Sequence, residues 1–187
     1  MGGIGSLILE TLKRRYLNMN LIVKDTDLAG VKLVTTDRFE DYRGELGGVY
    51  DEHEYSSAGL NKKFVYDMVS MSYKNVLRGM HGDSETTKLV QCLYGTVYSV
   101  VVNCNESSPD FGKWQSFILS DKNHNQLYIP PLYGNGYYVL SDSSIYTYKM
   151  SKAHSDSQFT YAWNDPRFDI RWPSKNPILS ERDEIKV

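Results

Sequence analysis

The sequence KLVQCLY (Lys88–Tyr94), followed by Gly95 and TVYSVVV (Thr96–Val102), decides the fold class. Both runs are rich in apolar, β-branched and aromatic residues, which favour extended backbone. Glycine adopts turn conformations that other residues reach only at a cost, so Gly95 marks a turn between the two runs. The stretch therefore predicts two consecutive short strands.

The same pattern continues along most of the chain. Further strands are predicted at Phe64–Tyr73, Trp114–Leu119, Leu127–Ile129, Tyr137–Leu140 and Ser144–Lys149. Polar and glycine-containing clusters, among them Gly134-Asn135-Gly136, separate these strands and are expected to form turns. Short strands at spacings of about ten residues, with no long helices between them, predict an all-β sandwich or barrel.

A change of pattern near residue 20 divides the chain. Ser6–Tyr16 has loosely helical spacing of its leucines, with a serine able to cap the first turn, and predicts a short helix. We expect residues 1–20 to form an N-terminal extension. Residues 21–187 contain no repeat, low-complexity tract or linker, and we expect them to form one domain.

Composition and charge exclude several kinds of partner. Lys and Arg number 21 against 23 Asp and Glu, giving a formal charge of −2. Nucleic acids and acidic membranes are usually bound by a basic field, which is missing here. No apolar run approaches the ~20 residues of a membrane span. Cys92 and Cys104 form no zinc-type pair and are typical of reduced thiols, so we expect a cytoplasmic protein without nucleic-acid or membrane partners.

The run Arg78-Gly79-Met80-His81 contains the first candidate for chemistry. Strict alternation along a strand would place Arg78 and His81 on opposite faces. A bulge at Gly79 would instead bring both side chains to one cavity. A lone histidine in a strand-rich protein is also often structural. The other three histidines lie in polar stretches that do not cluster with His81, so we predict no metal site.

Two predicted strands carry further candidates, each with an ordinary structural alternative. Lys88 opens a strand shortly after His81, where a lysine could equally protect a sheet edge. Tyr146 and Tyr148 point to one face of their strand. With 15 tyrosines in the chain, any single one is more typical of packing than of catalysis. Taken one at a time, these residues do not decide the function.

In their order and spacing, these motifs resemble the dTDP-4-dehydrorhamnose 3,5-epimerase family. The likeness runs from about Thr36 to Asp183 and rests on RGMH, KLV, GNGYYVLSD, YTYK, WNDPRFDIRWP and PILSERD. It implies a cupin-type jelly roll that forms a homodimer. It also implies an enzyme that acts on a nucleotide-diphosphate 4-keto-6-deoxy sugar with no cofactor and no metal.

The resemblance assigns catalytic roles that suit this chemistry. A carbon beside a ketone loses its proton only with help from a base and stabilisation of the enolate oxygen, and inversion requires the proton to return from the opposite face. His81 matches the family's base, and Asp183 matches the carboxylate that orients it. Tyr148 matches the acid on the other face, and Lys88 matches a lysine near the sugar C4 oxygen.

Substrate-binding roles follow from the same comparison of motifs. Arg43 and Arg78 match residues that hold the diphosphate, for which guanidinium groups are well suited. Three departures alter the expected pocket. Gly82-Asp83 follows His81 where the family usually has Tyr-Gln, and Asn135 replaces a second active-site histidine. Tyr66–Val69 replaces a polar stretch. We expect Asn135 and Tyr66 to contact the substrate in a changed pocket wall.

These observations predict an isomerase that inverts C3, and also C5, of a dTDP- or GDP-linked 4-keto-6-deoxy hexose or heptose for bacterial surface polysaccharide. An alternative is an epimerase that acts only at C3 of a GDP-4-keto-heptose, because Asn135 removes one helper. A second alternative is a sugar-nucleotide binding protein without turnover. A sugar ketoisomerase is less well matched, since that activity usually uses a second nearby histidine that Gly82-Asp83 does not supply.

Overall fold

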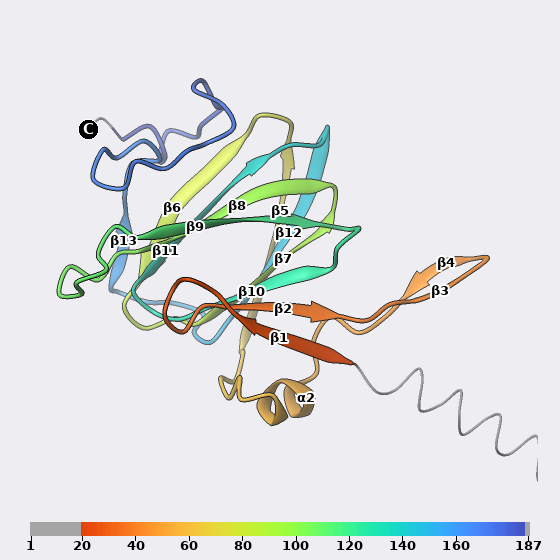
Figure 1. Cartoon of the computed structure of the whole chain (residues 1–187). Helices are drawn as coiled ribbons and strands as arrows, with labels where there is room; N and C mark the ends of the chain where they lie inside the picture. The colour runs from red at the N-terminus through yellow and green to blue at the C-terminus, as the bar shows by residue number, and fades with distance from the viewer. Residues whose placement is uncertain (1–19, 186–187) are drawn as a thin grey trace, which may run out of the picture.

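Two antiparallel sheets pack face to face to form the body of the protein (Figure 1). The computed structural model describes residues 20–185, so the helix predicted over Ser6–Tyr16 lies outside the described residues. The six-stranded sheet has the order β1 (Leu21–Asp25), β2 (Lys32–Thr36), β10 (Asn125–Ile129), β7 (Lys88–Tyr94), β12 (Ser143–Met150) and β5 (Tyr66–Tyr73). The five-stranded sheet has the order β13 (Gln158–Thr160), β6 (Leu77–Asp83), β11 (Tyr133–Val139), β8 (Thr96–Asn103) and β9 (Trp114–Ser120). The predicted all-β sandwich is confirmed.

Gly95 is the point where the chain passes from one sheet to the other. It separates β7 of the six-stranded sheet from β8 of the five-stranded sheet. Its φ angle is +81°, and a Cβ atom there would lie 2.2 Å from the carbonyl oxygen of Ser143. Only glycine fits this backbone conformation and this close approach. The two strands predicted from residues 88–102 are therefore present, in different sheets.

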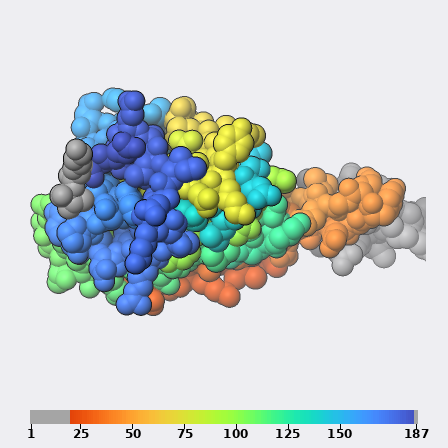
Figure 2. Space-filling view, turned by 90° about the horizontal axis from the view of Figure 1, so that it is seen from above, coloured from red at the N-terminus to blue at the C-terminus, as the bar shows by residue number. Residues whose placement is uncertain are grey.

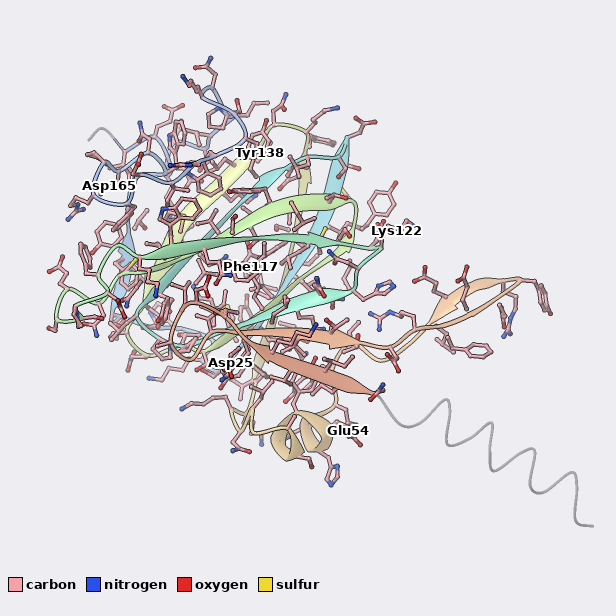
Figure 3. All side chains as sticks on the ribbon, viewed as in Figure 1. Asp25, Glu54, Phe117, Lys122, Tyr138 and Asp165 are labelled. Atoms are coloured by element: carbon pink, nitrogen blue, oxygen red, sulfur yellow. The ribbon has the colours of Figure 1, made fainter. Side chains whose placement is uncertain are left out.

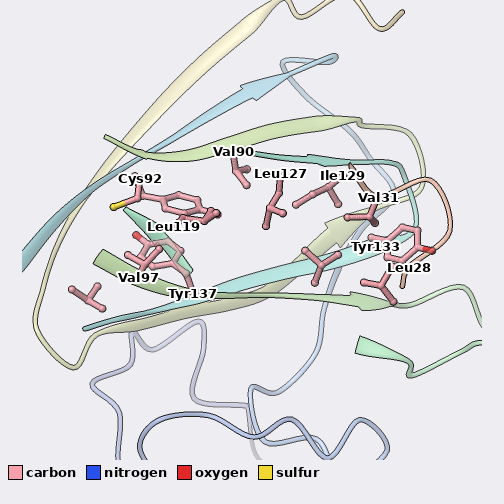
Figure 4. Close-up of a cluster of buried hydrophobic side chains, with 13 residues drawn as sticks. Leu28, Val31, Val90, Cys92, Val97, Leu119, Leu127, Ile129, Tyr133 and Tyr137 are labelled. Carbon is pink, nitrogen blue, oxygen red and sulfur yellow. The ribbon is translucent and has the colours of Figure 1, made fainter. Parts of the chain in front are cut away.

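The core fills the space between the two sheets, as the close-up in Figure 4 shows. Inward-facing residues alternate along the strands, with Val90 and Leu127 from one sheet meeting Val97 and Tyr137 from the other. Phe117 of β9, which is labelled in Figure 3, packs against this cluster. Removing this apolar surface from water provides the main favourable term in folding.

The Gly134-Asn135-Gly136 segment was predicted to be a turn, and that prediction is wrong. All three residues lie inside β11, every residue of which is buried. A Cβ atom on Gly136 would lie 2.7 Å from the Met80 Sδ atom, and one on Gly134 would lie 3.0 Å from the Cys104 Sγ atom. The glycines are needed because neighbouring groups approach the strand closely, which is a second common use of glycine in strands.

A small hairpin and a short helix lie outside the sandwich. The hairpin consists of β3 (Phe39–Asp41) and β4 (Gly44–Leu46), and it projects from the body in Figures 1 and 2. The helix α2 (Glu52–Ser57) is capped at its N-terminus by Asp51, whose side chain accepts a hydrogen bond from the Glu54 amide at 3.0 Å. Its buried Tyr55 covers part of the outer face of the six-stranded sheet.

The C-terminal segment after β13 covers the outer face of the five-stranded sheet. Phe168 and Trp172 of this segment pack with Val100 and Val102 of β8. The segment then returns to β6, where the Leu77 amide donates to the Ile178 carbonyl oxygen at 2.9 Å. This return brings Asp183 to the strand that carries His81. No helix in residues 20–185 has the length and apolar character needed to span a membrane.

Candidate active site

A cavity of about 170 Å³ receives side chains from both sheets. Arg78, His81 and Asn135 reach it from the five-stranded sheet, and Lys88 and Tyr148 reach it from the six-stranded sheet. These five residues were all selected from the sequence as site candidates. The structure therefore brings the predicted base and the predicted acid to one cavity, on opposite walls of the sandwich.

A β-bulge explains how Arg78 and His81 reach the same cavity. Asn135 lies opposite His81 and Tyr137 lies opposite Arg78, so three steps along β6 match two steps along β11. Gly79 lies within this irregularity with a φ angle of +135°. A Cβ atom there would lie 2.5 Å from the Gly136 Cα atom, so only glycine fits. The bulge expected at Gly79 is thus present.

His81 is paired with a buried carboxylate. The distance from its Nε2 atom to Asp183 Oδ1 is 2.8 Å, and only 4% of the Asp183 side chain is exposed. Ser180 Oγ donates to the other carboxylate oxygen at 3.0 Å. Burial by itself would raise the pKa of Asp183, but the interactions with His81, Ser180 and Arg182 outweigh it and lower that pKa. Asp183 is therefore ionised at neutral pH and holds the imidazole by one edge.

Lys88 provides a positive charge inside the cavity. Its strand lies in the interior of the six-stranded sheet, between β10 and β12, so Lys88 does not protect a sheet edge. The side chain is buried, and its Nζ atom donates to the His81 carbonyl oxygen at 3.2 Å. Desolvation lowers the pKa of Lys88, while the nearby carboxylate of Asp83 acts in the opposite direction. Such a fixed donor is suited to stabilise charge that develops on a ligand oxygen.

Tyr148 faces His81 from the opposite sheet. Its ring packs against Tyr146, with the centroids 5.0 Å apart, which confirms that the two tyrosines share a face of β12. Desolvation raises the pKa of Tyr148 well above its ordinary value, and the neighbouring Tyr137 and Tyr146 raise it further. The phenol therefore remains protonated and can act as a proton donor over the whole neutral range.

Asn135 and Arg78 are held in the cavity wall by hydrogen bonds. The Asn135 side-chain amide donates to the Val100 carbonyl oxygen at 2.9 Å and to Ser99 Oγ at 3.2 Å. The Arg78 Nε atom donates to Ser72 Oγ at 2.9 Å, which orients its guanidinium group beside the cavity.

Two predicted substrate-binding residues are not among those that line the cavity. Arg43 lies at the turn of the projecting hairpin, where its guanidinium group pairs with Asp41, so it does not join Arg78 within this chain. Tyr66 lies at the start of β5 with 42% of its surface exposed. Met68, two residues further along the same face of the strand, contributes to the cavity in its place.

Other residues that line the cavity were not selected from the sequence as site residues: Met68, Gly82, Asp83, Met150, Gln158 and Arg182. The sequence could have indicated two of them, because Met68 shares a strand face with Tyr66 and Arg182 directly precedes Asp183. Gln158 gave no such indication, because its strand has three residues. Within residues 20–185 no group of three or more His, Cys, Asp or Glu side chains is placed to hold a metal ion.

Comparison with known proteins gives one consistent result. The family model of dTDP-4-dehydrorhamnose 3,5-epimerase matches residues 25–187. The enzymes of that name from Shigella flexneri and Escherichia coli K12 are 38% and 37% identical, covering 88% and 89% of this chain and 93% and 92% of theirs.

Solved structures agree with the sequence matches. A Legionella pneumophila dTDP-6-deoxy-D-glucose-3,5-epimerase in complex with dTDP-4-keto-L-rhamnose has a TM-score of 0.83 at 33% identity, covering 88% of this chain and 90% of its own. A Bacillus anthracis dTDP-4-dehydrorhamnose 3,5-epimerase with TDP and pyrophosphate bound has a TM-score of 0.84 at 34% identity, covering 89% and 98%. The expected cupin-type jelly roll is confirmed by these neighbours. The chain belongs to the dTDP-4-dehydrorhamnose 3,5-epimerase family and is an isomerase of the carbohydrate epimerase type.

Proposed function

We propose that this enzyme inverts C3, and also C5, of a nucleotide-diphosphate 4-keto-6-deoxy sugar without a metal or cofactor. The observation that carries the proposal is the placement of His81 and Tyr148 on opposite walls of one cavity. Inversion needs a proton acceptor on one side of the sugar ring and a proton donor on the other. A site with both groups on the same wall would return the proton to the face it left.

The proposed reaction uses each cavity residue in one role. Neutral His81 takes the proton from the carbon beside the C4 ketone, and the electron pair of that C–H bond moves into the enolate. The ammonium group of Lys88 stabilises the enolate oxygen, and Asp183 stabilises the imidazolium that forms. Tyr148 then gives its proton to the opposite face of the carbon. Proton exchange with solvent restores both side chains.

The family relationship supports a nucleotide sugar as the ligand. The solved relatives hold dTDP-4-keto-L-rhamnose or TDP with pyrophosphate. In this chain we assign Arg78 to the diphosphate, because its guanidinium group lies at the cavity and is oriented by Ser72. A nucleotide sugar of this kind is made and used in the cytoplasm, and we infer a role in bacterial surface polysaccharide synthesis.

A second candidate is an epimerase that acts only at C3 of a GDP-4-keto-heptose. Two observations favour it over a standard member of the family. Asn135 stands in the cavity where the family carries a second histidine, and Met68 now lines the wall formed by the changed Tyr66–Val69 stretch. Both changes leave the His81 and Tyr148 pair intact while they alter the surface that presents the sugar ring.

Solvent exchange separates these candidates. The protein is incubated in D₂O with either dTDP-4-keto-6-deoxyglucose or GDP-4-keto-6-deoxymannoheptose, and deuterium at C3 and C5 is followed by NMR. Exchange at both carbons supports the first proposal, and exchange at C3 alone of the heptose supports the second. Binding of either nucleotide sugar without exchange at any carbon would refute both and identify a binding protein.

Two substitutions connect the exchange to the site. His81→Asn and Tyr148→Phe should each suppress inversion while circular dichroism and thermal unfolding remain close to those of the parent protein. Tyr146→Phe is the matched control, because Tyr146 lies on the same strand face but its hydroxyl contacts Ser99 in the core. Undiminished inversion in both site variants would exclude the proposed mechanism.

The enzyme is further proposed to act as a homodimer. Val69, Met71 and Tyr73 alternate with the cavity-facing residues of β5, and each is more than half exposed on the outer face of the six-stranded sheet. A second copy would remove these side chains from water. The projecting hairpin would then lie against the second copy, which gives Arg43 a nucleotide to contact. Sedimentation should show a dimer that Met71→Lys weakens; a monomeric parent protein would refute this assembly.

A further inference from the structure

We propose that Thr160 is a positioning residue for the proton-accepting nitrogen of His81. Thr160 Oγ1 lies 3.2 Å from His81 Nδ1, and Asp183 holds the other ring nitrogen. The two contacts together fix both the position and the plane of the imidazole. This inference rests on the proposed function, since it concerns the group that we assign as the base.

The sheet register brings the two side chains together. Met80 and Tyr161 exchange two backbone hydrogen bonds, of 3.2 Å and 3.0 Å, and so form a hydrogen-bonded pair between β6 and β13. The next pair along the strands is His81 and Thr160. In an antiparallel sheet this next pair makes no backbone hydrogen bonds to each other, and its side chains approach most closely.

The packing of β13 fixes the position of Thr160. Phe159 and Tyr161 point to the opposite face, where they join the cluster around Phe168. The Phe159 ring occupies the space beside Gly82, since a Cβ atom on Gly82 would lie 2.4 Å from that ring. The neighbours of Thr160 on both sides are therefore held by aromatic packing. This short strand is anchored well enough to orient a hydroxyl group.

The chemistry of the imidazole gives the Thr160 hydroxyl its role once the ring has become protonated. A carboxylate accepts hydrogen bonds only, so the neutral ring carries its proton on Nε2, facing Asp183, and its lone pair on Nδ1. Nδ1 is then the atom that takes the proton from the sugar. In the resting site the Thr160 O–H must point away from Nδ1, so that the lone pair is open to the sugar proton; after proton transfer the Thr160 oxygen accepts a hydrogen bond from the new Nδ1–H group. Valine has a similar shape but cannot accept this hydrogen bond.

Two matched substitutions test this role. Thr160→Val removes the hydroxyl and should lower kcat by about five- to tenfold with little change in KM, since one hydrogen bond to the base is lost. Thr160→Ser keeps the hydroxyl and should restore most of the rate. Thr147→Val is the control, because that hydroxyl bonds to the Gln91 backbone and does not line the cavity. An unchanged kcat in Thr160→Val would overturn the proposal.

A spectroscopic measurement separates this inference from the proposed function. The ¹⁵N chemical shift of His81 Nδ1, measured in the ligand-free protein with the imidazole protonated, should change in Thr160→Val and remain near the parent value in Thr160→Ser. This shift reports the contact even if the protein proves not to be an epimerase. Identical Nδ1 shifts in the parent protein and in Thr160→Val would overturn the positioning role while leaving the His81 and Tyr148 mechanism standing.

Discussion

The pairing of His81 with Asp183 yields the sharpest prediction for this enzyme. Asp183→Asn keeps the size of the side chain and an oxygen that can accept a hydrogen bond, but it removes the negative charge. In the parent protein that charge lies next to one nitrogen of the imidazole, with Asp183 Oδ1 at 2.8 Å from His81 Nε2. The charge has its effect when His81 becomes positive, which happens only after the sugar has lost its proton.

The size of the effect follows from Coulomb's law. Unit charges whose centres lie about 4 Å apart attract by about 4 kcal/mol at an effective dielectric constant of about 20. Each 1.36 kcal/mol in the barrier changes the rate about tenfold, so the full interaction corresponds to a factor of roughly 1,000. His81 keeps 28% of its side chain exposed, and water there will screen part of the attraction. We therefore expect kcat to fall by about 100- to 1,000-fold.

Deuterium incorporation under saturating substrate measures this loss directly. Because the lost interaction develops in the transition state, kcat and kcat/KM should fall together while KM stays within a few-fold. Glu184→Gln is the matched control, since it removes one exposed negative charge beside Asp183 in sequence. A loss of less than about fivefold in Asp183→Asn, with the parent fold intact, would show that Asp183 does not stabilise the imidazolium.

Four further outcomes are expected. Asp183→Asn should lower the free energy of unfolding relative to the parent protein above the unfolded-state pKa of about 3.9. This loss should shrink as pH falls through the lowered folded-state pKa, and a loss that persists unchanged in acid would contradict it. Lys88→Met should lower kcat at least about 100-fold yet raise the melting temperature at pH 7, because it removes a buried charge. Since burial lowers the pKa of Lys88, that stability gain should shrink as pH rises towards 10, and a gain that grows would be inconsistent. Because the pKa of Tyr148 is raised and that of Lys88 is lowered, any alkaline decline in kcat should come from Lys88, so a pH–rate profile of Lys88→Met should lack the decline seen in the parent protein. Gly82→Ala should cost about 1–3 kcal/mol of stability through its clash with Phe159, measured by chemical denaturation.

The sequence was most informative where local rules settle the geometry. Alternation along β12 placed Tyr146 and Tyr148 on one face, and their rings indeed lie 5.0 Å apart. Gly79 indicated a bulge because two chemically useful residues on one strand would otherwise face apart, and the register between β6 and β11 shifts at that point. Both inferences depend on contacts between neighbours in sequence or on a single strand.

Positions fixed by distant parts of the chain could not be predicted in this way. Gly134 and Gly136 have the composition of a turn, but they are glycines because Cys104 and Met80 approach β11 from elsewhere. Thr160 lies in a strand of three residues whose pairing with β6 has no local signal. Arg43 was matched by motif alone, and the projection of its hairpin away from the body depends on the three-dimensional arrangement.

The structure also shows which of the changed positions face the cavity and which do not. The family resemblance implies that Gly82 replaces a tyrosine, which by itself would suggest a larger pocket. The Phe159 ring of β13 lies beside Gly82 on the sheet face opposite Thr160 and His81, so a side chain at position 82 would point away from these two residues. Asn135 and Met68 do face the cavity, with the Asn135 amide nitrogen already bonded to Ser99 and Val100. A ligand in this cavity would meet the Asn135 amide and the Met68 thioether, so these two positions are the first to test for a difference in substrate.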